Sequence, residues 1–146
     1  MKFMLNGAVT LGTLDGANIE INEAAGEGNN IIFGMTTPEV NALKARGYNP
    51  TEYFNNNGII HEAIERMYHG INGCTFNDVA NSLKDRDPYM VLADFDSYKN
   101  AQRYVTECYN DKMKWAKMSL NNIAGAGIFS ADRAVTEYAD NIWHLR

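Results

Sequence analysis

Three polar side chains, His61, Glu65 and His69, follow one another at intervals of four residues and could hold a metal ion. Residues four apart share one face of a helix, and imidazole and carboxylate groups are ligands of zinc. The zinc-binding HExxH pattern, however, requires histidine where Glu65 stands. A tetrahedral site would also need another ligand from elsewhere in the chain. We therefore expect a surface helix here and no metal site.

Two neighbouring carboxylates, Asp94 and Asp96, could form an acid–base pair. They stand where a helix is expected to begin, and negative charges in a first turn interact favourably with the helix dipole. We expect Asp94 to be the N-cap of that helix and neither carboxylate to be catalytic.

Two glycine-containing turns resemble parts of ligand-binding loops. Gly26-x-Gly28 lacks the remainder of a phosphate-binding GxGxxG pattern and precedes a strand, so it is expected to be a plain loop. The turn Asp15–Asn18 joins a strand end to a helix start, where α/β folds often bind ligands. Ordinary turn chemistry is the favoured explanation, with proximity to a ligand site as the alternative.

Lys2 is a further side chain with reactive potential, because a primary amine can form a Schiff base. Judged by residue type alone, a lysine near a terminus is a solvated charge, because covalent catalysis by lysine requires desolvation and an electrophilic partner. The residues by themselves therefore assign no site.

Composition excludes several classes of protein. The 146 residues are 45% hydrophobic, carry a net charge of −5 and contain no stretch near the roughly 20 apolar residues of a membrane-spanning helix. The basic residues are scattered, so we expect no nucleic-acid or membrane partner. Cys74 and Cys108 lack a metal-binding or disulfide pattern, which favours buried, reduced thiols in a cytoplasmic protein.

Periodicity and capping residues predict strands and helices in the first part of the chain. Residues 8–13 and 31–33 are expected to be strands flanking a helix over 17–25, which is a βαβ order. Helices are expected after a Thr37 N-cap, from Pro50 after an Asn49 cap, and over 59–69, and a last strand is expected over 89–92.

The last third shows the strongest helical periodicity. Apolar residues recur at intervals of three and four over 95–108, 113–123 and 131–142, which predicts three consecutive helices. Ser130 is the expected N-cap of the third. The apolar side of this helix, with Ile142 and Trp143, could either pack on the core or remain exposed.

Specific segments resemble one family. Met1–Ala8, MKFMLNGA, is similar to the pyridoxal-phosphate attachment segment of the α-glucan phosphorylases, which comprise the glycogen, starch and maltodextrin phosphorylases. The resemblance continues over residues 12–20, 32–35, 46–48, 92–95, 129–133 and 138–143. It covers essentially the whole chain.

This resemblance implies an α/β fold, namely the C-terminal part of a Rossmann-like domain of the two-domain GT-B type. Residues 1–146 would be a truncated cofactor-side domain, with few short parallel strands and helices over 1–93 and closing helices over 94–146. The truncated sheet would have an unpaired edge, which predicts self-association that light scattering would test. The parent would be a glycosyltransferase that releases glucose 1-phosphate from α-1,4-glucans by phosphorolysis. Lys2 would form the Schiff base to pyridoxal 5′-phosphate.

The same resemblance places the family's glucose-binding residues and phosphate-binding cations upstream of Met1. No complete catalytic set is then expected here, and the isolated chain is expected to be inactive and empty of cofactor because a terminal lysine frays. Weak cofactor capture at Lys2 is a second possibility. A third is that the chain is itself the natural product, a non-catalytic remnant or a structural, partner-binding module.

Overall fold

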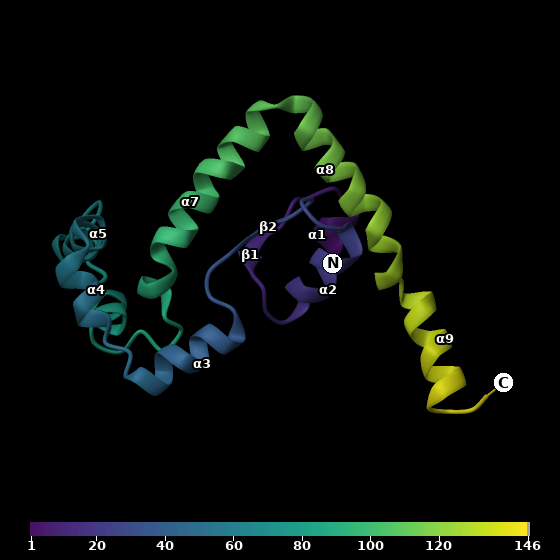
Figure 1. Cartoon of the computed structure of the whole chain (residues 1–146), viewed down its shortest axis with the longest axis horizontal. Helices are drawn as coiled ribbons and strands as arrows, with labels where there is room; N and C mark the ends of the chain where they lie inside the picture. The colour runs from purple at the N-terminus through teal and green to yellow at the C-terminus, as the bar shows by residue number, and fades with distance from the viewer. Residues whose placement is uncertain (146) are drawn as a thin grey trace. The chain divides into compact units, whose positions relative to one another are not determined.

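The computed structural model describes residues 1–145, which form two compact units (Figure 1). The first comprises Met1–Ile32 and the C-terminal residues from Ala101 onward, and the second comprises Phe33–Asn100. The expected strand/helix part, 1–93, and the expected closing helices, 94–146, each contribute residues to both units. The two units are described separately below.

The N-terminal part of the first unit contains the predicted strand–helix–strand order. A four-residue helix, α1 (Lys2–Leu5), precedes β1 (Leu11–Thr13), α2 (Ala17–Ala25) and β2 (Ile31–Phe33), whose last residue belongs to the second unit. The two strands form a parallel sheet. At its start the Ile31 N–H of β2 donates to the carbonyl of Thr10, the residue before β1, at 2.8 Å. The strand predicted over 8–13 is therefore shorter than expected, whereas β2 and α2 have the predicted bounds.

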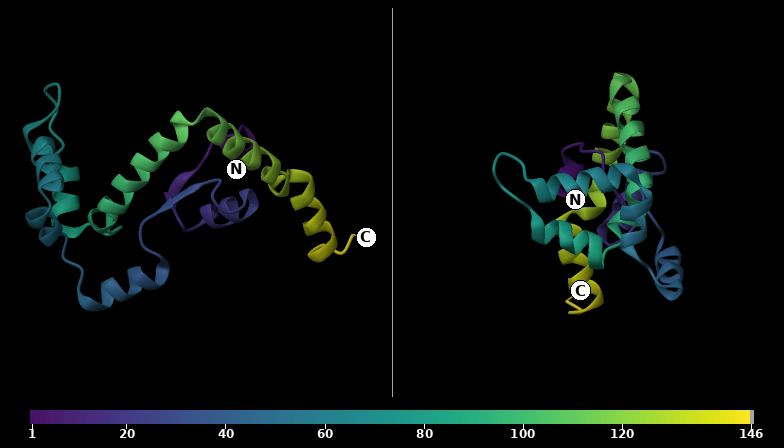
Figure 2. Two further views of the ribbon diagram at one scale, coloured as in Figure 1. Left: turned by 45° about the horizontal axis from the view of Figure 1, so that its top comes forward. Right: turned by 90° about the vertical axis from the view of Figure 1, so that its left-hand side faces the viewer.

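The C-terminal part of the first unit is helical. It contains the end of α7 (Val91–Asn110), then α8 (Lys112–Gly125), the short 3₁₀ helix η2 (Ala126–Phe129) and α9 (Ala131–Asn141). These confirm the three predicted closing helices, and the Ser130 side chain caps α9 by accepting from the Arg133 N–H. α8 lies against α1 and α2 (Figure 2).

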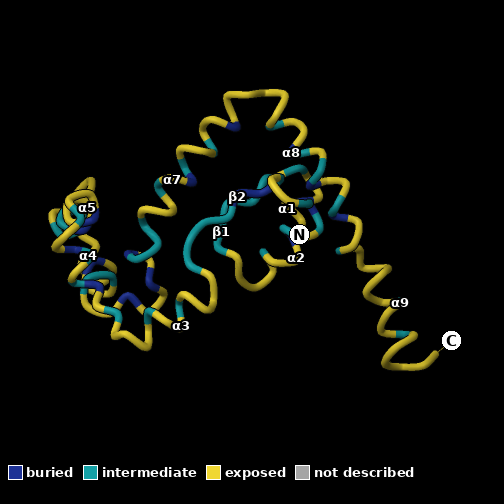
Figure 3. Tube along the Cα trace, in the orientation of Figure 1, coloured by how far each residue is buried: buried dark blue, intermediate teal, exposed yellow. Residues whose placement is uncertain are grey.

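The small core of the first unit is formed where α8 and η2 meet the N-terminal helices. Met4, Ile21, Ala25 and Ala126 are buried together there. α9 has no buried residue and is exposed over nearly its whole length (Figure 3). Its apolar side stays open, with Ile142 60% and Trp143 57% exposed. Over the described residues, no helix combines the length and apolar character needed to cross a membrane.

The second unit packs short helices around one apolar cluster. These are α4 (Pro50–Asn56), α5 (Gly58–His69), α6 (Asn77–Asn81) and the π-helical turn η1 (Ser82–Arg86). α3 (Thr37–Arg46) precedes them and has no buried residue. The cluster contains Phe54, Ile60, Ile64, Ala80 and Leu92. α3 begins at Thr37, one residue earlier than predicted, because its cap is Thr36, which exchanges hydrogen bonds with Glu39 in a capping box, and not Thr37.

The predicted strand over 89–92 is wrong, because the chain is already helical at Val91. The carboxylate of Asp87, 1% exposed, accepts hydrogen bonds from the Val91 N–H at 2.9 Å and the Leu92 N–H at 2.8 Å. These bonds satisfy N–H groups that a helix start leaves without partners. Asp87 therefore starts α7, and the expectation that Asp94 is the N-cap is also wrong.

The Tyr48 hydroxyl also donates to this carboxylate, at 2.6 Å from Asp87 Oδ2, the oxygen that accepts from the Leu92 N–H. Burial and this bond raise the pKa of Tyr48 above its ordinary value of 10.0, since both disfavour the phenolate. The bond thus stabilises the fold fully below pH 10, and its contribution is lost as the pH rises and the unfolded tyrosine ionises first.

We therefore expect the stability difference between the natural chain and Tyr48→Phe to be constant from about pH 8 to about pH 9 and to narrow as the pH rises from about 10 to about 11. Urea unfolding of both proteins across that range measures the difference and cancels the titration of other groups. A difference that stays constant with pH would contradict the inferred pKa shift of Tyr48.

Candidate functional site

Lys2, the residue that the sequence resemblance singles out, lies at the start of α1 with an exposed side chain. The single turn of α1 is closed by the Leu5 N–H, which donates to the Met1 carbonyl at 3.0 Å. The Asn6 side-chain amide donates to the Lys2 carbonyl at 2.8 Å. Among residues 1–145, none forms a hydrogen bond or ion pair with the Lys2 amine. This amine is therefore available to a reagent.

The turn that carries Lys2 is held to the first unit by a buried side chain. Met4 is 2% exposed and packs with Ile21 and Ala25 of α2 and with Ala126 of η2. Burying a methionine side chain contributes roughly 1.5–3 kcal/mol. α1 is too short to be stable as an isolated helix, so this packing accounts for its presence.

A second contact ties the end of this turn to α8. The Ser119 hydroxyl donates to the Gly7 carbonyl at 2.8 Å. Gly7 has φ +81°, and a Cβ there would overlap the Ser119 hydroxyl oxygen and lie 3.2 Å from Ile123 Cδ1. Only glycine meets both the backbone conformation and the close approach.

An asparagine network fixes α8 to the loop between α2 and β2. The fully buried Asn122 donates through Nδ2 to the Asn29 carbonyl at 2.8 Å and to the Met118 carbonyl at 3.0 Å. Asn121 donates to Asn29 Oδ1 at 2.8 Å, and the Asn29 amide donates to the Ala25 carbonyl at 2.9 Å. The 26–28 segment is a loop, as predicted, held by these bonds.

Sequence reasoning missed Ser119 and Asn122. The apolar stripe predicted for α8 includes Met113 and Leu120, yet these are 80% and 63% exposed, and the helix buries Met118 and Asn122 instead. Asn122 lies four residues after Met118, so these two share one face. A polar side chain on a buried helix face requires a partner, which here is supplied by the distant Asn29.

The Asp15–Asn18 turn shows ordinary turn chemistry. The Asn18 N–H donates to the Asp15 carbonyl at 3.0 Å, and the Asn18 side chain donates to the Thr13 carbonyl at 2.9 Å. Gly16 has a positive φ of +48°. These contacts explain the residue types of the turn, and among the described residues the carboxylate of Asp15 forms no ion pair with Lys2.

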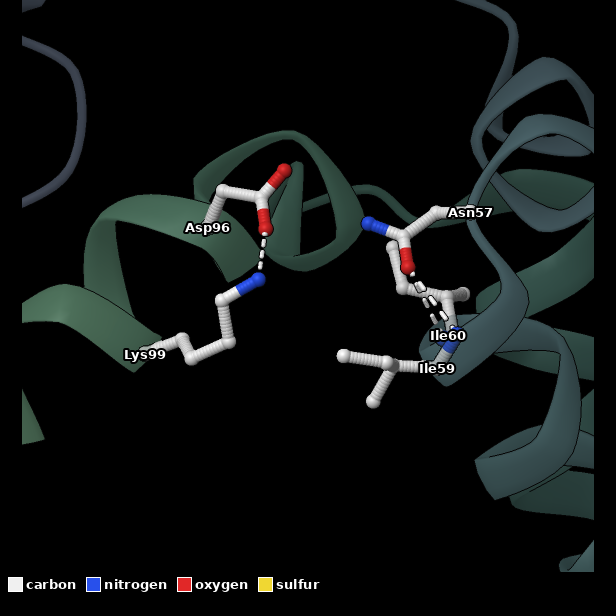
Figure 4. A network of polar contacts seen from close by, with 5 residues as sticks. All are labelled: Asn57, Ile59, Ile60, Asp96 and Lys99. Atoms are coloured by element: carbon white, nitrogen blue, oxygen red, sulfur yellow. Dashed lines mark hydrogen bonds and ion pairs between the residues drawn. The ribbon is translucent and has the colours of Figure 1, made fainter.

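The paired carboxylates Asp94 and Asp96 do not act together. Asp94 Oδ1 accepts from the Met35 N–H at 2.8 Å, so it holds the segment after β2. Asp96 forms an ion pair with Lys99, near the Asn57 side chain that caps α5 (Figure 4). Glu52, Tyr53 and Asn56 complete a shallow cavity of about 320 Å³ with Asn57 and Asp96.

The histidines and cysteines show no shared site. His61 stacks on Phe54 with ring centroids 4.4 Å apart, and His69 Nδ1 is 2.7 Å from the Glu65 carbonyl oxygen. Across residues 1–145, no three histidine, cysteine, aspartate or glutamate side chains are grouped to hold a metal ion. Cys108 is buried as expected, but the expectation of burial is wrong for Cys74, which is exposed in a turn.

Comparisons with known proteins agree with the resemblance. A family model described as carbohydrate phosphorylase matches residues 1–145. The chain is 47% identical to a glycogen phosphorylase of Synechocystis sp., covering 100% of this chain and 18% of that protein. It is 43% identical to the brain form of glycogen phosphorylase of Ovis aries, covering 98% of this chain and 17% of that protein. It is 42% identical to the muscle form of glycogen phosphorylase of Rattus norvegicus, covering 99% of this chain and 18% of that protein.

Two facts follow from these matches. The chain spans less than a fifth of the length of these relatives, with 18% of the Synechocystis protein covered. The match runs through α1, where Lys2 lies, as well as through all the closing helices. The chain belongs to the carbohydrate phosphorylase family.

Proposed function

We propose that this chain is the cofactor-lysine segment of an α-glucan phosphorylase, a glycosyltransferase that shortens α-1,4-glucans by phosphorolysis. Orthophosphate would take the terminal glucosyl group and displace the shortened glucan. The bond from C1 to the glucan oxygen breaks, a bond from C1 to a phosphate oxygen forms, and a proton moves to the freed 4-oxygen to give a hydroxyl. The observation that carries this proposal is the 42–47% identity to proteins named glycogen phosphorylases over essentially the whole chain.

The residues around Lys2 fit pyridoxal 5′-phosphate. The cofactor's aldehyde requires a primary amine that is free of ion pairs, and Lys2 supplies one on a turn anchored by Met4. Bound at Lys2, the cofactor would supply a phosphate group that exchanges protons with the substrate phosphate. An empty cofactor site is expected where a terminal lysine frays. In this structure the burial of Met4 and the hydrogen bond to Gly7 hold the turn that carries Lys2, which supports cofactor binding there.

Three further proposals concern the whole protein. The βαβ order and the closing helices support the GT-B, Rossmann-like domain that the family resemblance implies. A cytoplasmic location fits the two free cysteines. Self-association through the sheet is supported by the two three-residue strands, which leave both edges unpaired within the described sheet.

The direct test is to trap the cofactor on its lysine. The polypeptide carrying this segment is incubated with pyridoxal 5′-phosphate, reduced with borohydride and mapped by mass spectrometry. We expect the adduct on Lys2 and complete loss of that adduct in Lys2→Arg, because arginine keeps the charge but not the nucleophilic amine. Lys44→Arg, which alters another lysine near the surface, is the control and should label normally.

An adduct spread over many lysines, with none favoured, would overturn the assignment of Lys2. Mass spectrometry of the native polypeptide adds a second arm, because peptides preceding Met1 would show that the segment belongs to a longer enzyme. A native species limited to these 146 residues would instead favour the non-catalytic, structural module.

A further inference from the structure

The hydrogen bond between Ser119 and Gly7 joins residues 112 positions apart. Within residues 1–145 it is the only hydrogen bond between α8 and the turn that follows α1. The hydroxyl oxygen of Ser119 lies where a Gly7 side chain would begin. The serine is half-buried, so water competes poorly for the Gly7 carbonyl. The two residues are therefore fitted to each other.

Backbone hydrogen bonds connect this contact to Lys2. The Gly7 N–H donates to the Met4 carbonyl at 2.9 Å, and the Ala8 N–H donates to the Phe3 carbonyl at 2.9 Å. The Asn6 side-chain amide donates to the Lys2 carbonyl at 2.8 Å and so connects the end of the turn to its first residue. A displacement of Gly7 consequently displaces the turn whose first residue is Lys2.

α8 is a rigid support for this path. Asn122, one turn after Ser119 on the same helix, is fully buried and bonded to Asn29. Gly125 lies so close to α2 that a Cβ there would be 2.7 Å from the Ala24 carbonyl carbon. Because α8 is held at both points, the Ser119 hydroxyl has a fixed position relative to the core that buries Met4.

We propose that Ser119 is a positioning residue for the cofactor-bearing lysine: its bond to Gly7 sets the direction in which Lys2 leaves α1. This rests on the proposed function of Lys2. Met4 anchors the turn by non-directional packing, which allows rotation, whereas the hydrogen bond at Gly7 fixes the orientation. The Lys2 amine and the cofactor aldehyde condense with release of one water, and that reaction requires the amine at a defined place.

The test compares three variants of the polypeptide that carries this segment. Ser119→Ala removes the Gly7 bond, and Ser119→Thr restores a hydroxyl. Ser97→Ala is the matched control, because Ser97 also makes one hydrogen bond to a glycine, accepting from the Gly34 N–H at 2.9 Å. The readouts are the pyridoxal 5′-phosphate concentration that half-saturates borohydride trapping at Lys2, the absorbance of the bound cofactor, and amide hydrogen exchange at Leu5 and Gly7.

We expect Ser119→Ala to raise the half-saturating concentration about fivefold, which corresponds to about 1 kcal/mol, to alter the cofactor absorbance and to speed exchange at Gly7. Ser119→Thr and Ser97→Ala should trap like the natural protein. Equal trapping by Ser119→Ala and the natural protein overturns the positioning role alone. Equal weakening by Ser119→Ala and Ser97→Ala also overturns it, since the effect is then general instability. Absence of any Lys2 adduct in the natural protein overturns the proposed function first.

Discussion

Gly125→Ala is expected to destabilise the first unit by about 3 kcal/mol. A Cβ at this position would overlap the Ala24 carbonyl oxygen and lie 2.7 Å from the Ala24 carbonyl carbon and 3.1 Å from the Ala25 nitrogen. All three are backbone atoms of α2, so no side-chain rotation relieves the overlap. α8 and α2 would have to separate, which opens the core around Ile21 and Ala25. Urea unfolding followed by circular dichroism measures the loss.

Gly127→Ala is the matched control for this prediction. A Cβ at Gly127 meets nothing within 4 Å, so the same added methyl group should change stability by less than about 1 kcal/mol. If both variants unfold at the same urea concentration, the close approach of α8 to α2 is not present in solution. Exposed Leu120→Ala offers a further comparison within α8, since its side chain is 63% exposed.

Asp87→Ala is expected to destabilise the second unit by about 3 kcal/mol. The Asp87 carboxylate is buried and accepts from the Tyr48 hydroxyl and from two N–H groups at the start of α7. Alanine would leave all three donors without a partner in a region closed to water, and each unpaired buried group costs free energy. Leu92, which follows directly, is part of the apolar cluster, so the damage extends to that core.

Two milder substitutions separate the contributions to the Asp87 network. Tyr48→Phe removes one donor together with its need for a partner and should cost only about 1 kcal/mol at neutral pH. Asp87→Asn retains one acceptor oxygen and tolerates the left-handed backbone, φ +32°, and should fall between these values. If Asp87→Ala costs no more than Tyr48→Phe, the N–H groups of α7 are satisfied by water and the buried cap is not structural.

Local signals predicted much of the secondary structure. α2 and β2 have the predicted bounds, α4 begins at Pro50 as its Asn49 cap indicated, and Ser130 caps α9. In each case the side chain that starts the element lies within a few residues of the backbone group that it satisfies, so the relevant information is contiguous. The start of α7 was missed because its cap, Asp87, stands four residues before Val91 and reaches past the left-handed Met90.

For the candidate site, the sequence identified the reactive lysine but not the residues that hold it in place. Lys2 was identified by resemblance to a family motif, since its residue type and position alone indicate only a surface charge. The residues that support it could not be identified in this way. Ser119 and Gly7 are separated by 112 positions and Asn122 and Asn29 by 93, and no periodicity links residues so far apart.

The sequence by itself determined the family, the lysine that can bear the cofactor and most helix starts, because these depend on short contiguous motifs and local hydrogen bonds. The tertiary structure alone decided which face of α8 is buried, where Gly125 must lack a side chain and which hydroxyl holds the lysine turn. The physical reason is that close packing and buried hydrogen bonds depend on which surfaces meet. That pairing is a property of the folded chain rather than of any one segment.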